Sequence, residues 1–390
     1  MDKKLFIANW EEIKEGKVSD VYFHRAKEII LKKGLDKRVK MEVRAGHLPY
    51  PWAVFCGLPE VLNLLEDLPV NVWAMEEGTV FFEDEPVLLI EGNYSEFGVF
   101  ETALLGFLCQ SSGISTKAAR CKKAAGDKIV LSFGARRIHP AISPMVERSA
   151  FIGGCDGVAV VKSAEILGEK PVGTMPHALI LLAGDEIEAF LAFDEIMEED
   201  ILRIALVDTF GDEKFVSLKA AESLGKKLYG VRLDTPSSRR GDFLRILEEV
   251  RWELNLRGYS WVKIFVSGGI DEYKIMELNP LADGYGVGTS IANAPVIDFS
   301  LDIVEIEEKP IAKKGKKSGA KQVWRCWDCL KDRVSPWKEK EEICKNCGKN
   351  LSPLLIPVVQ NGKIVYTPPS PQKLRERVLG QIKKLKLDND

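Results

Sequence analysis

The sequence predicts an α/β protein in three parts: an N-terminal α+β domain over residues 1–110, a (βα) barrel-like domain over 111–304, and a small cysteine-containing module over 305–390. From Lys128 onward, short apolar runs alternate with helical patterns, which is typical of βα units and a parallel sheet. After Val304 a charged, glycine-containing stretch leads to four cysteines. A closed or nearly closed barrel gathers many strand ends at one mouth, and an open sheet is the alternative.

The N-terminal part mixes helices with strands. The segment "VYFHRAKEIILKKG" has helical spacing and stops at Gly34. The segment from Val70 to Gly92 predicts strands broken by turns. The next segment, "FGVFETALLGFLCQSSGISTKAARCKKAAG", predicts two helices on either side of a small-residue turn at residues 111–113.

In the central part, the predicted strands end in residues that can carry chemistry. The strand segments are "KIVLSFG", "VGTMPH", "LRIALVDTFG", "KLYGVRLD", "WVKIFVSGG" and "ADGYGVGTS". Parallel strands of a barrel bring their carboxyl ends to one face, where active sites of such folds lie. The residues concerned are Arg136, His177, Asp208, Arg232, Asp234 and Ser267.

Composition limits the classes of protein. The 390 residues carry a formal net charge of −3, so no global field attracts nucleic acid or an anionic membrane. No apolar run is long enough for a membrane span, and the N-terminus has no signal-peptide pattern. We therefore expect a cytoplasmic protein with no membrane or nucleic-acid partner. The many Lys and Glu and few Asn and Gln lean towards a thermophilic source.

Two glycine-rich turns each follow an apolar run and precede a predicted helix. The first is Ser267-Gly268-Gly269, and the second runs from Gly286 to Ser290, including Gly288 and Thr289. Such turns expose backbone N–H groups, and the following helix adds the positive end of its dipole. Late strands of (βα) barrels commonly hold a phosphate between two such turns. Together they predict a phosphate site, although either turn alone is weak evidence.

The segment "SFGARRIHP" places Phe133 beside Arg136 and Arg137. A flat aromatic face next to cations suits a planar anionic heterocycle or a phosphate, and a basic surface turn is an equally good interpretation.

Three further segments carry titratable side chains. His177 lies at a predicted strand-to-helix junction, where a lone histidine is more often structural than functional. Arg232 and Asp234 lie two residues apart on one side of a strand, and Asp208 ends the strand before it. Carboxylates at such ends can hold Mg²⁺ on a polyphosphate or accept ribose hydroxyls.

Two Cys-x₂-Cys pairs lie near the C-terminus, fourteen residues apart. Four thiolates at this spacing predict a closed tetrahedral zinc site with a structural role. The ligands would be Cys326, Cys329, Cys344 and Cys347. Zinc ribbons also bind nucleic acid, which leaves a zinc-ribbon nucleic-acid-binding protein with a degenerate barrel as an alternative of another class.

Seven segments, in order, resemble the nicotinate phosphoribosyltransferase family in its shorter archaeal-type form with a C-terminal zinc module. The resemblance covers essentially the whole chain. The segments are "SDVYF" (19–23), "SSGISTKAAR" (111–120), "FGARR" (133–137), "GTMPHA" (173–178), "VRLD" (231–234), "VSGGID" (266–271) and "GVGTS" (286–290).

The resemblance implies a type II phosphoribosyltransferase. Nicotinate would attack C1 of 5-phosphoribosyl-1-pyrophosphate to give nicotinate mononucleotide and pyrophosphate, with Mg²⁺ on the departing pyrophosphate. Phe133 would stack on one face of the pyridine ring. Tyr22 from a neighbouring subunit would cover the other face, which makes the protein a homo-oligomer, at least a dimer with shared active sites.

The resemblance also implies roles for the other residues. Arg136 or Arg137 would pair with substrate anions, and Arg232 and Asp234 would orient ribose and ring. The 5-phosphate would be held by Ser267, Gly268, Gly269, Gly288 and Thr289.

His177 matches the family's histidine that is phosphorylated from ATP, so ATP is an expected co-substrate. Quinolinate phosphoribosyltransferase, which also decarboxylates its substrate, shares the fold and is the main alternative. Nicotinamide phosphoribosyltransferase is a further alternative, because carboxylate and carboxamide differ by one charge.

Overall fold

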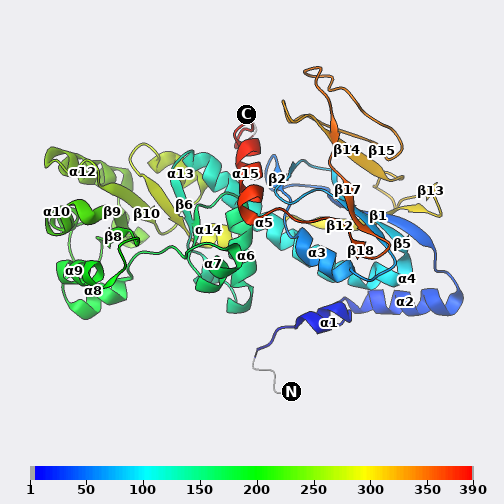
Figure 1. Cartoon of the computed structure of the whole chain (residues 1–390), viewed down its shortest axis with the longest axis horizontal. Coiled ribbons are helices and arrows are strands. Elements are labelled where there is room, and N and C mark those ends of the chain that lie inside the picture. The colour runs from blue at the N-terminus through cyan, green and yellow to red at the C-terminus, as the bar shows by residue number, and fades with distance from the viewer. Residues whose placement is uncertain (1–4, 389–390) are drawn as a thin grey trace. The chain divides into compact units, whose positions relative to one another are not determined.

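The computed structural model describes residues 5–388, which form two compact units (Figure 1). Unit 1 joins the described parts of residues 1–116 and 295–390, and unit 2 consists of residues 117–294. Unit 2 carries the predicted βα pattern. The three predicted domain ranges stay predictions, because compact units in a folded structure do not show which parts of the chain fold independently.

Unit 2 is built on a six-stranded parallel sheet in the order β7-β6-β11-β10-β9-β8. Four of the strands are fully buried except at single positions, as expected when helices cover both faces. The strands are β6 (Ile129–Ser132), β7 (Gly157–Val158), β8 (Arg203–Leu206), β9 (Leu228–Leu233), β10 (Lys263–Ser267) and β11 (Gly284–Val287).

The sheet of unit 2 has two edges, so the predicted closed or nearly closed barrel is in fact an open half-barrel. In a closed barrel the edge strands β7 and β8 would pair, and within residues 5–388 they do not. The prediction of a strand at "VGTMPH" is wrong, because residues 171–176 are irregular. The sixth strand of the sheet is instead β7, which the sequence analysis did not predict.

The helices of unit 2 follow from amphipathic spacing and side-chain caps. In α12, Phe243, Leu247, Val250 and Leu254 are buried on one face, and Asp242 caps the first turn. The helices are α6 (Ser143–Ile152), α7 (Val161–Leu167), α8 (His177–Ala183), α9 (Glu186–Ile196), α10 (Glu213–Leu224), α11 (Ser237–Arg240), α12 (Phe243–Leu256), α13 (Glu272–Leu278) and α14 (Thr289–Ala292).

Unit 1 is organised around a seven-stranded antiparallel sheet in the order β13-β12-β1-β5-β3-β17-β18. The strands are β1 (Arg38–Ala45), β3 (Asn71–Ala74), β5 (Pro86–Asn93), β12 (Phe299–Ile306), β13 (Lys309–Pro310), β17 (Ile356–Gln360) and β18 (Lys363–Ile364). Two smaller sheets pair β2 (Ala53–Val54) with β4 (Val80–Phe81), and β14 (Lys321–Arg325) with β15 (Asp332–Pro336) and β16 (Ser352–Pro353). The mixture of helices and strands agrees with the sequence in outline.

The helices of unit 1 include one that the sequence analysis divided wrongly. The predicted pair of helices is a single helix, α5, without a turn at residues 111–113. The small residues there serve close packing: a Cβ on Gly113 would lie 2.3 Å from the carbonyl oxygen of Pro295. The helices are α1 (Trp10–Lys14), α2 (Val21–Lys33), α3 (Leu58–Leu65), α4 (Tyr94–Phe97), α5 (Glu101–Ala125), whose residues from 117 onward belong to unit 2, and α15 (Pro371–Ile382).

By length and composition alone the stretch Tyr94–Ala125 is able to cross a membrane. However, 56% of its most apolar window is buried inside the protein, which is usual for a core helix.

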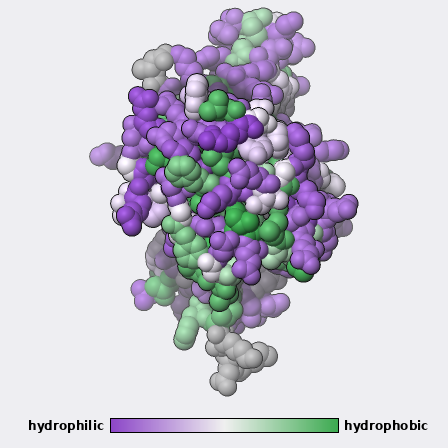
Figure 2. Space-filling view, turned by 90° about the vertical axis from the view of Figure 1, so that its left-hand side faces the viewer, coloured by the Kyte–Doolittle hydropathy of each residue, from purple (hydrophilic) through white to green (hydrophobic). Residues whose placement is uncertain are grey.

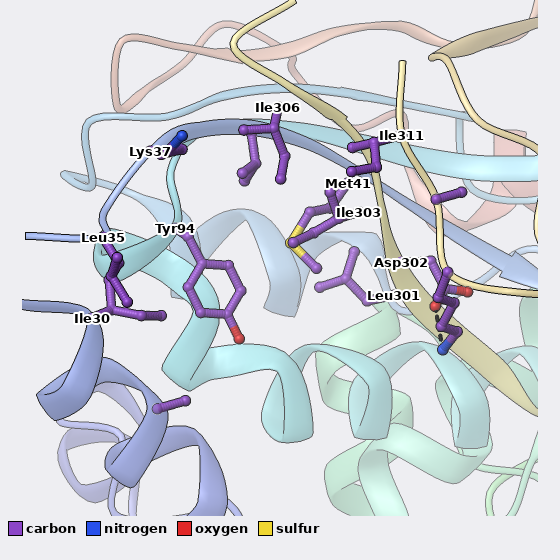
Figure 3. A pocket seen from close by; sticks show the side chains of 14 residues that line it. Ile30, Leu35, Lys37, Met41, Tyr94, Leu301, Asp302, Ile303, Ile306 and Ile311 are labelled. Atoms are coloured by element: carbon purple, nitrogen blue, oxygen red, sulfur yellow. Dashed lines mark ion pairs between the residues drawn. The ribbon is translucent and has the colours of Figure 1, made fainter. Parts of the chain in front are cut away.

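Unit 1 also contains an aliphatic pocket of about 630 Å³ between α2 and the β1–β12 part of the sheet. Figure 3 shows the Tyr94 ring projecting into it between Leu35 and Leu301, with the Asp302 carboxylate at the far side. Close to this pocket, burial and the charge of Asp302 raise the pKa of Glu101 to about 7. The folded protein therefore holds a proton on Glu101 that the unfolded chain releases near pH 4.5.

This raised pKa gives a testable pH dependence. Because the pKa is higher in the folded state, Glu101 stabilises the fold below about pH 4.5, and that contribution is lost as the pH rises through about 7. Glu101→Gln removes the titration. We expect its melting temperature, relative to wild type, to be about 2 °C higher at pH 8 than at pH 5. Glu11→Gln, on the exposed face of α1, should track wild type at both pH values. An equal offset for Glu101→Gln at the two pH values would contradict the assignment.

Candidate active site

Strand order brings the predicted site residues together at the carboxyl edge of the parallel sheet. The last strand of unit 2, β11, lies between β6 and β10. Phe133 follows β6, and its peptide N–H donates to the carbonyl oxygen of Val287 at 2.9 Å. The two glycine-rich turns, after β10 and β11, are therefore neighbours, and the "FGARR" segment lies next to the second of them.

A polar pocket of about 430 Å³ opens at this edge, within the range of small-molecule sites. Aromatic, cationic and backbone groups converge on it from four different strand ends. Its walls include Phe133, Arg136, Arg137, Arg232, Asp234, Ser267, Gly268, Gly269, Asp271, Gly286, Gly288, Thr289 and Ser290.

Arg232 organises the floor of the pocket. This residue is 9% exposed, and its Nη1 donates to the Ser267 hydroxyl at 3.1 Å while Nη2 donates to the Met175 carbonyl at 3.0 Å. The Ser267 hydroxyl in turn donates to Asp234 Oδ1 at 2.9 Å. A guanidinium fork held at both ends and a carboxylate held by a hydroxyl are pre-organised, so neither needs to reorient when a substrate binds.

A second group of titratable side chains adjoins Asp234. His177 Nε2 lies 3.9 Å from Asp208 Oδ2 and 3.9 Å from Asp234 Oδ2, and Nδ1 is 3.0 Å from the Thr209 hydroxyl. The Asp208 side chain is 2% exposed, and neither carboxylate oxygen has a hydrogen-bond partner within residues 5–388. Burial raises the pKa of Asp208, and the nearby imidazole acts in the opposite direction. An unpaired buried carboxylate facing a histidine is suited to a bound cation or to ribose hydroxyls.

The structure places most of the predicted site residues in these two adjoining groups. Tyr22 is the exception: it lies on α2 of unit 1, is 58% exposed, and has its ring 4.3 Å from that of Phe23. The roles of all these residues stay predictions.

Sequence reasoning missed several contributors. Met175 and Thr209 lie in segments that the sequence analysis singled out for His177 and Asp208, but their own contributions, a backbone carbonyl and a hydroxyl, were not identified. Arg240 belongs to none of the segments singled out, although it follows "VRLDTP" closely enough to reach the same strand end.

The glycine at position 288 offers a clean test of the phosphate site. A Cβ there would meet nothing closer than the Phe133 carbonyl oxygen at 3.4 Å, so Gly288→Val should fold. The side chain would still obstruct approach of a phosphate to the backbone N–H groups. We expect the KM for the phosphoribosyl donor to rise about ten- to a hundredfold, with little change in the KM for the base.

Steady-state kinetics on both substrates measure this effect, and Gly46→Val, at an open exposed position of unit 1, is the matched control. Equal changes in both KM values would count against a phosphate site. Gly268→Val should act in the same direction but less selectively. Its φ is +81°, and its Cβ would lie 2.9 Å from Asp234 Oδ1.

The four C-terminal cysteines form a cluster in unit 1. All four sulfur atoms lie within 4.8 Å of one another. The Sγ–Sγ distances are 3.4 Å for Cys326–Cys347, 3.7 Å for Cys329–Cys344 and 3.7 Å for Cys329–Cys347. A tetrahedron with zinc–sulfur bonds of about 2.3 Å has edges of about 3.8 Å, so the donor set fits zinc.

Fold and site together define a phosphoribosyltransferase. Two family models match the chain: "Quinolinate phosphoribosyl transferase, N-terminal domain" over residues 20–112 and "Quinolinate phosphoribosyl transferase, C-terminal domain" over residues 114–302. The chain belongs to this family, and its seven ordered motifs place it among type II phosphoribosyltransferases. The alternative of a nucleic-acid-binding protein is thereby set aside.

Known relatives carry two kinds of name. The chain is 57% identical to the nicotinate-nucleotide pyrophosphorylase of Pyrococcus furiosus, with a TM-score of 0.96 over 98% of each chain. A nicotinate phosphoribosyltransferase of Mycobacterium tuberculosis is 31% identical over 315 residues, 75% of this chain and 64% of that protein. This chain therefore spans less than two thirds of that relative. The human nicotinic acid phosphoribosyltransferase, 19% identical with a TM-score of 0.75, shares the fold.

These comparisons correct the main functional interpretation of the sequence. The sequence was interpreted as a nicotinate phosphoribosyltransferase. The two family models and the 57% identical structure instead favour the alternative given with it, quinolinate phosphoribosyltransferase. The physical reason for the error is that the matched motifs surround the ribose, the phosphate and one ring face. Both reactions use these groups, and the two bases differ only by one carboxylate.

Proposed function

We propose that the chain is a quinolinate phosphoribosyltransferase. It would transfer the 5-phosphoribosyl group of 5-phosphoribosyl-1-pyrophosphate to the ring nitrogen of quinolinate. The products are nicotinate mononucleotide, pyrophosphate and carbon dioxide, which places the reaction in pyridine nucleotide synthesis. Phosphoribosyl transfer is supported by the convergence of two glycine-rich turns, a phenyl ring and several arginines on one pocket of about 430 Å³, and quinolinate as the base is supported by the two family models and the 57% identical structure.

The residues divide the work by chemistry. The turns at Ser267–Gly269 and Gly288–Thr289 would hold the 5-phosphate through backbone N–H groups. Phe133 would stack on the pyridine ring, and the exposed guanidinium groups of Arg136 and Arg137 would face its two carboxylates. Two adjacent cations match a dicarboxylate better than a monocarboxylate.

The carboxylates would act on the ribose. Arg232 holds Asp234 beside the pocket, where its charge favours the positive charge that develops at C1 as the bond to pyrophosphate breaks. Asp208 and Asp234 would hold Mg²⁺, which neutralises pyrophosphate charge when bound. The unpaired oxygens of Asp208 support this assignment.

Other parts of the proposal rest on fewer observations. Phosphorylation of His177 from ATP stays a prediction. The structural zinc of an archaeal-type C-terminal module is part of the proposal, supported by the fit of the four sulfur atoms.

A homo-oligomer is supported by exposed apolar side chains on both units. On α8 and α9, Leu182 is 87% and Ile196 is 71% exposed, and on α2 Tyr22 is 58% exposed. Figure 2, which faces the α8–α12 side of unit 2, shows such apolar groups between hydrophilic ones.

A substrate panel tests the proposed function. Purified protein is incubated with 5-phosphoribosyl-1-pyrophosphate, Mg²⁺ and, separately, quinolinate, nicotinate or nicotinamide. Products are separated by chromatography, and carbon dioxide is measured from quinolinate labelled in the 2-carboxylate. We expect nicotinate mononucleotide and carbon dioxide in equal amounts with quinolinate. Turnover of nicotinate or nicotinamide with none of quinolinate would overturn the proposal.

A further inference from the structure

Arg240, the last residue of α11, ties together the turns that follow β9 and β10. Its Nε donates to the Thr235 carbonyl oxygen at 2.9 Å. Its Nη2 donates to the carbonyl oxygens of Gly268 at 2.8 Å and Ser267 at 3.2 Å. The guanidinium lies over the ring of Phe243, with the central carbon 4.4 Å from the ring centroid. One planar side chain thus fixes three carbonyl groups on two neighbouring strand ends.

These hydrogen bonds determine which way the peptide N–H groups of the first glycine-rich turn point. In a trans peptide the carbonyl oxygen and the N–H hydrogen point in opposite directions, and the chain has no cis bonds among its described residues. Holding the carbonyls of Ser267 and Gly268 on Arg240 therefore turns the N–H groups of Gly268 and Gly269 to the opposite side. Both glycines have positive φ, +81° and +66°, which glycine adopts without the strain that a Cβ would bring.

The N–H groups directed in this way have no acceptor within the protein. No hydrogen bond from the peptide nitrogen of Gly268 or Gly269 is formed within residues 5–388, and both glycines line the polar pocket. Gly268 is half-buried and Gly269 is exposed, and both line the pocket. Two successive peptide N–H groups without a protein acceptor form a concavity suited to an anionic ligand.

The guanidinium also brings a charge that no acid neutralises by direct contact. Arg240 forms no ion pair in the described part of the chain, and its five N–H donors are directed to carbonyl oxygens or left free. A positive charge directly behind the N–H groups adds to their attraction for a dianionic phosphate.

We propose that Arg240 is a positioning residue for the 5-phosphate of the phosphoribosyl donor, acting through the Ser267–Gly269 turn without touching the substrate. The inference rests on the proposed function only for the identity of the donor. It adds a residue that lies outside the pocket wall and sets the geometry of its anion-binding face.

Two variants and a neighbour control test this role. Arg240→Ala removes both charge and hydrogen bonds, and Arg240→Lys keeps the charge but cannot span carbonyls on two turns. Arg239→Ala changes the adjacent exposed arginine of the same helix and is the matched control. Binding of ribose 5-phosphate is measured by isothermal titration calorimetry without any base, and KM values are measured for donor and base.

We expect both Arg240 variants to weaken ribose 5-phosphate binding, and to raise the donor KM, by about ten- to a hundredfold, with the KM for the base unchanged. Arg239→Ala should match wild type. Full binding by Arg240→Lys would overturn the positioning role, and so would equal losses for donor and base. If wild type itself bound no ribose 5-phosphate, the proposed function would fail together with this inference. Failure of quinolinate turnover alone would leave the inference standing.

Discussion

Removing the metal from the cysteine cluster is expected to unfold the C-terminal module of unit 1. We expect one zinc per chain, held by Cys326, Cys329, Cys344 and Cys347, because their sulfur atoms already lie at tetrahedral spacing. Structural zinc contributes apparent binding free energies on the order of 10 kcal/mol in small zinc-binding peptides. Without it, only weak contacts between sulfur atoms 3.4–3.7 Å apart join the two knuckles. The two knuckles also have few apolar side chains that would hold them otherwise.

The loss should spread beyond the knuckles through Arg325, which directly precedes the first ligand. Its guanidinium is fully buried, pairs with Asp332 and donates to the Val80 carbonyl oxygen at 2.6 Å. We expect chelation to lower the melting temperature by more than about 10 °C.

Elemental analysis of protein purified without chelator, followed by calorimetry before and after chelation, measures both quantities. Cys344→Ser should lose the metal, whereas Cys109→Ser, at a half-buried cysteine outside the cluster, should retain it. Protein free of both zinc and iron would rule the site out.

Mixing two inactive variants is expected to restore activity. Tyr22→Ala and Arg136→Ala should each be nearly inactive, because a planar base needs both faces covered and its carboxylates paired. The resemblance to nicotinate phosphoribosyltransferases implies that Tyr22 acts in the site of a neighbouring subunit. In a mixed dimer, one site would then contain both wild-type residues and the other neither.

Random subunit exchange should therefore restore about a quarter of wild-type activity, given twofold symmetry. Co-expression with two different affinity tags isolates the mixed oligomers, and activity per site is compared with each parent variant. Arg239→Ala mixed with Tyr22→Ala is the control. Because Arg239 lies outside the site, every site that contains a wild-type Tyr22 should be active in this mixture. Mixed oligomers without regained activity would show that Tyr22 does not complete a neighbour's site.

The local chemistry of the site was predictable from sequence because it depends on short segments. A glycine-rich turn at a strand end presents N–H groups whatever the rest of the fold does, so both turns were identified as candidate phosphate-binding segments, and the structure places them side by side at the pocket. Their adjacency was expected from their late, successive positions. The direct neighbourhood of Phe133 and the second turn depends on the pairing of β11 with β6, some 150 residues earlier, which nothing local in the sequence specifies.

The failures have physical causes of a similar kind. Serine and glycine at residues 111–113 resemble a turn in sequence, but they are small because another backbone approaches α5 there. The segment before His177 resembles a strand, but residues 171–176 stay irregular although the Val172 peptide N–H donates to the Val158 carbonyl oxygen of β7 at 2.8 Å. Arg240 was missed because its partners are backbone carbonyls, and a backbone carbonyl has no sequence signature.

The way unit 2 is inserted within unit 1 has a consequence for how the protein is made. A chain leaving the ribosome presents β1, β3 and β5 first, but their sheet lacks β12 and β17 until residues near 360 have been synthesised. The parallel sheet, by contrast, is complete once residue 287 has emerged. The half synthesised first is thus finished last, and in the interval β1 and β3 expose unpaired edges. Nascent chains arrested between residues 300 and 350 should therefore be the ones that chaperones capture.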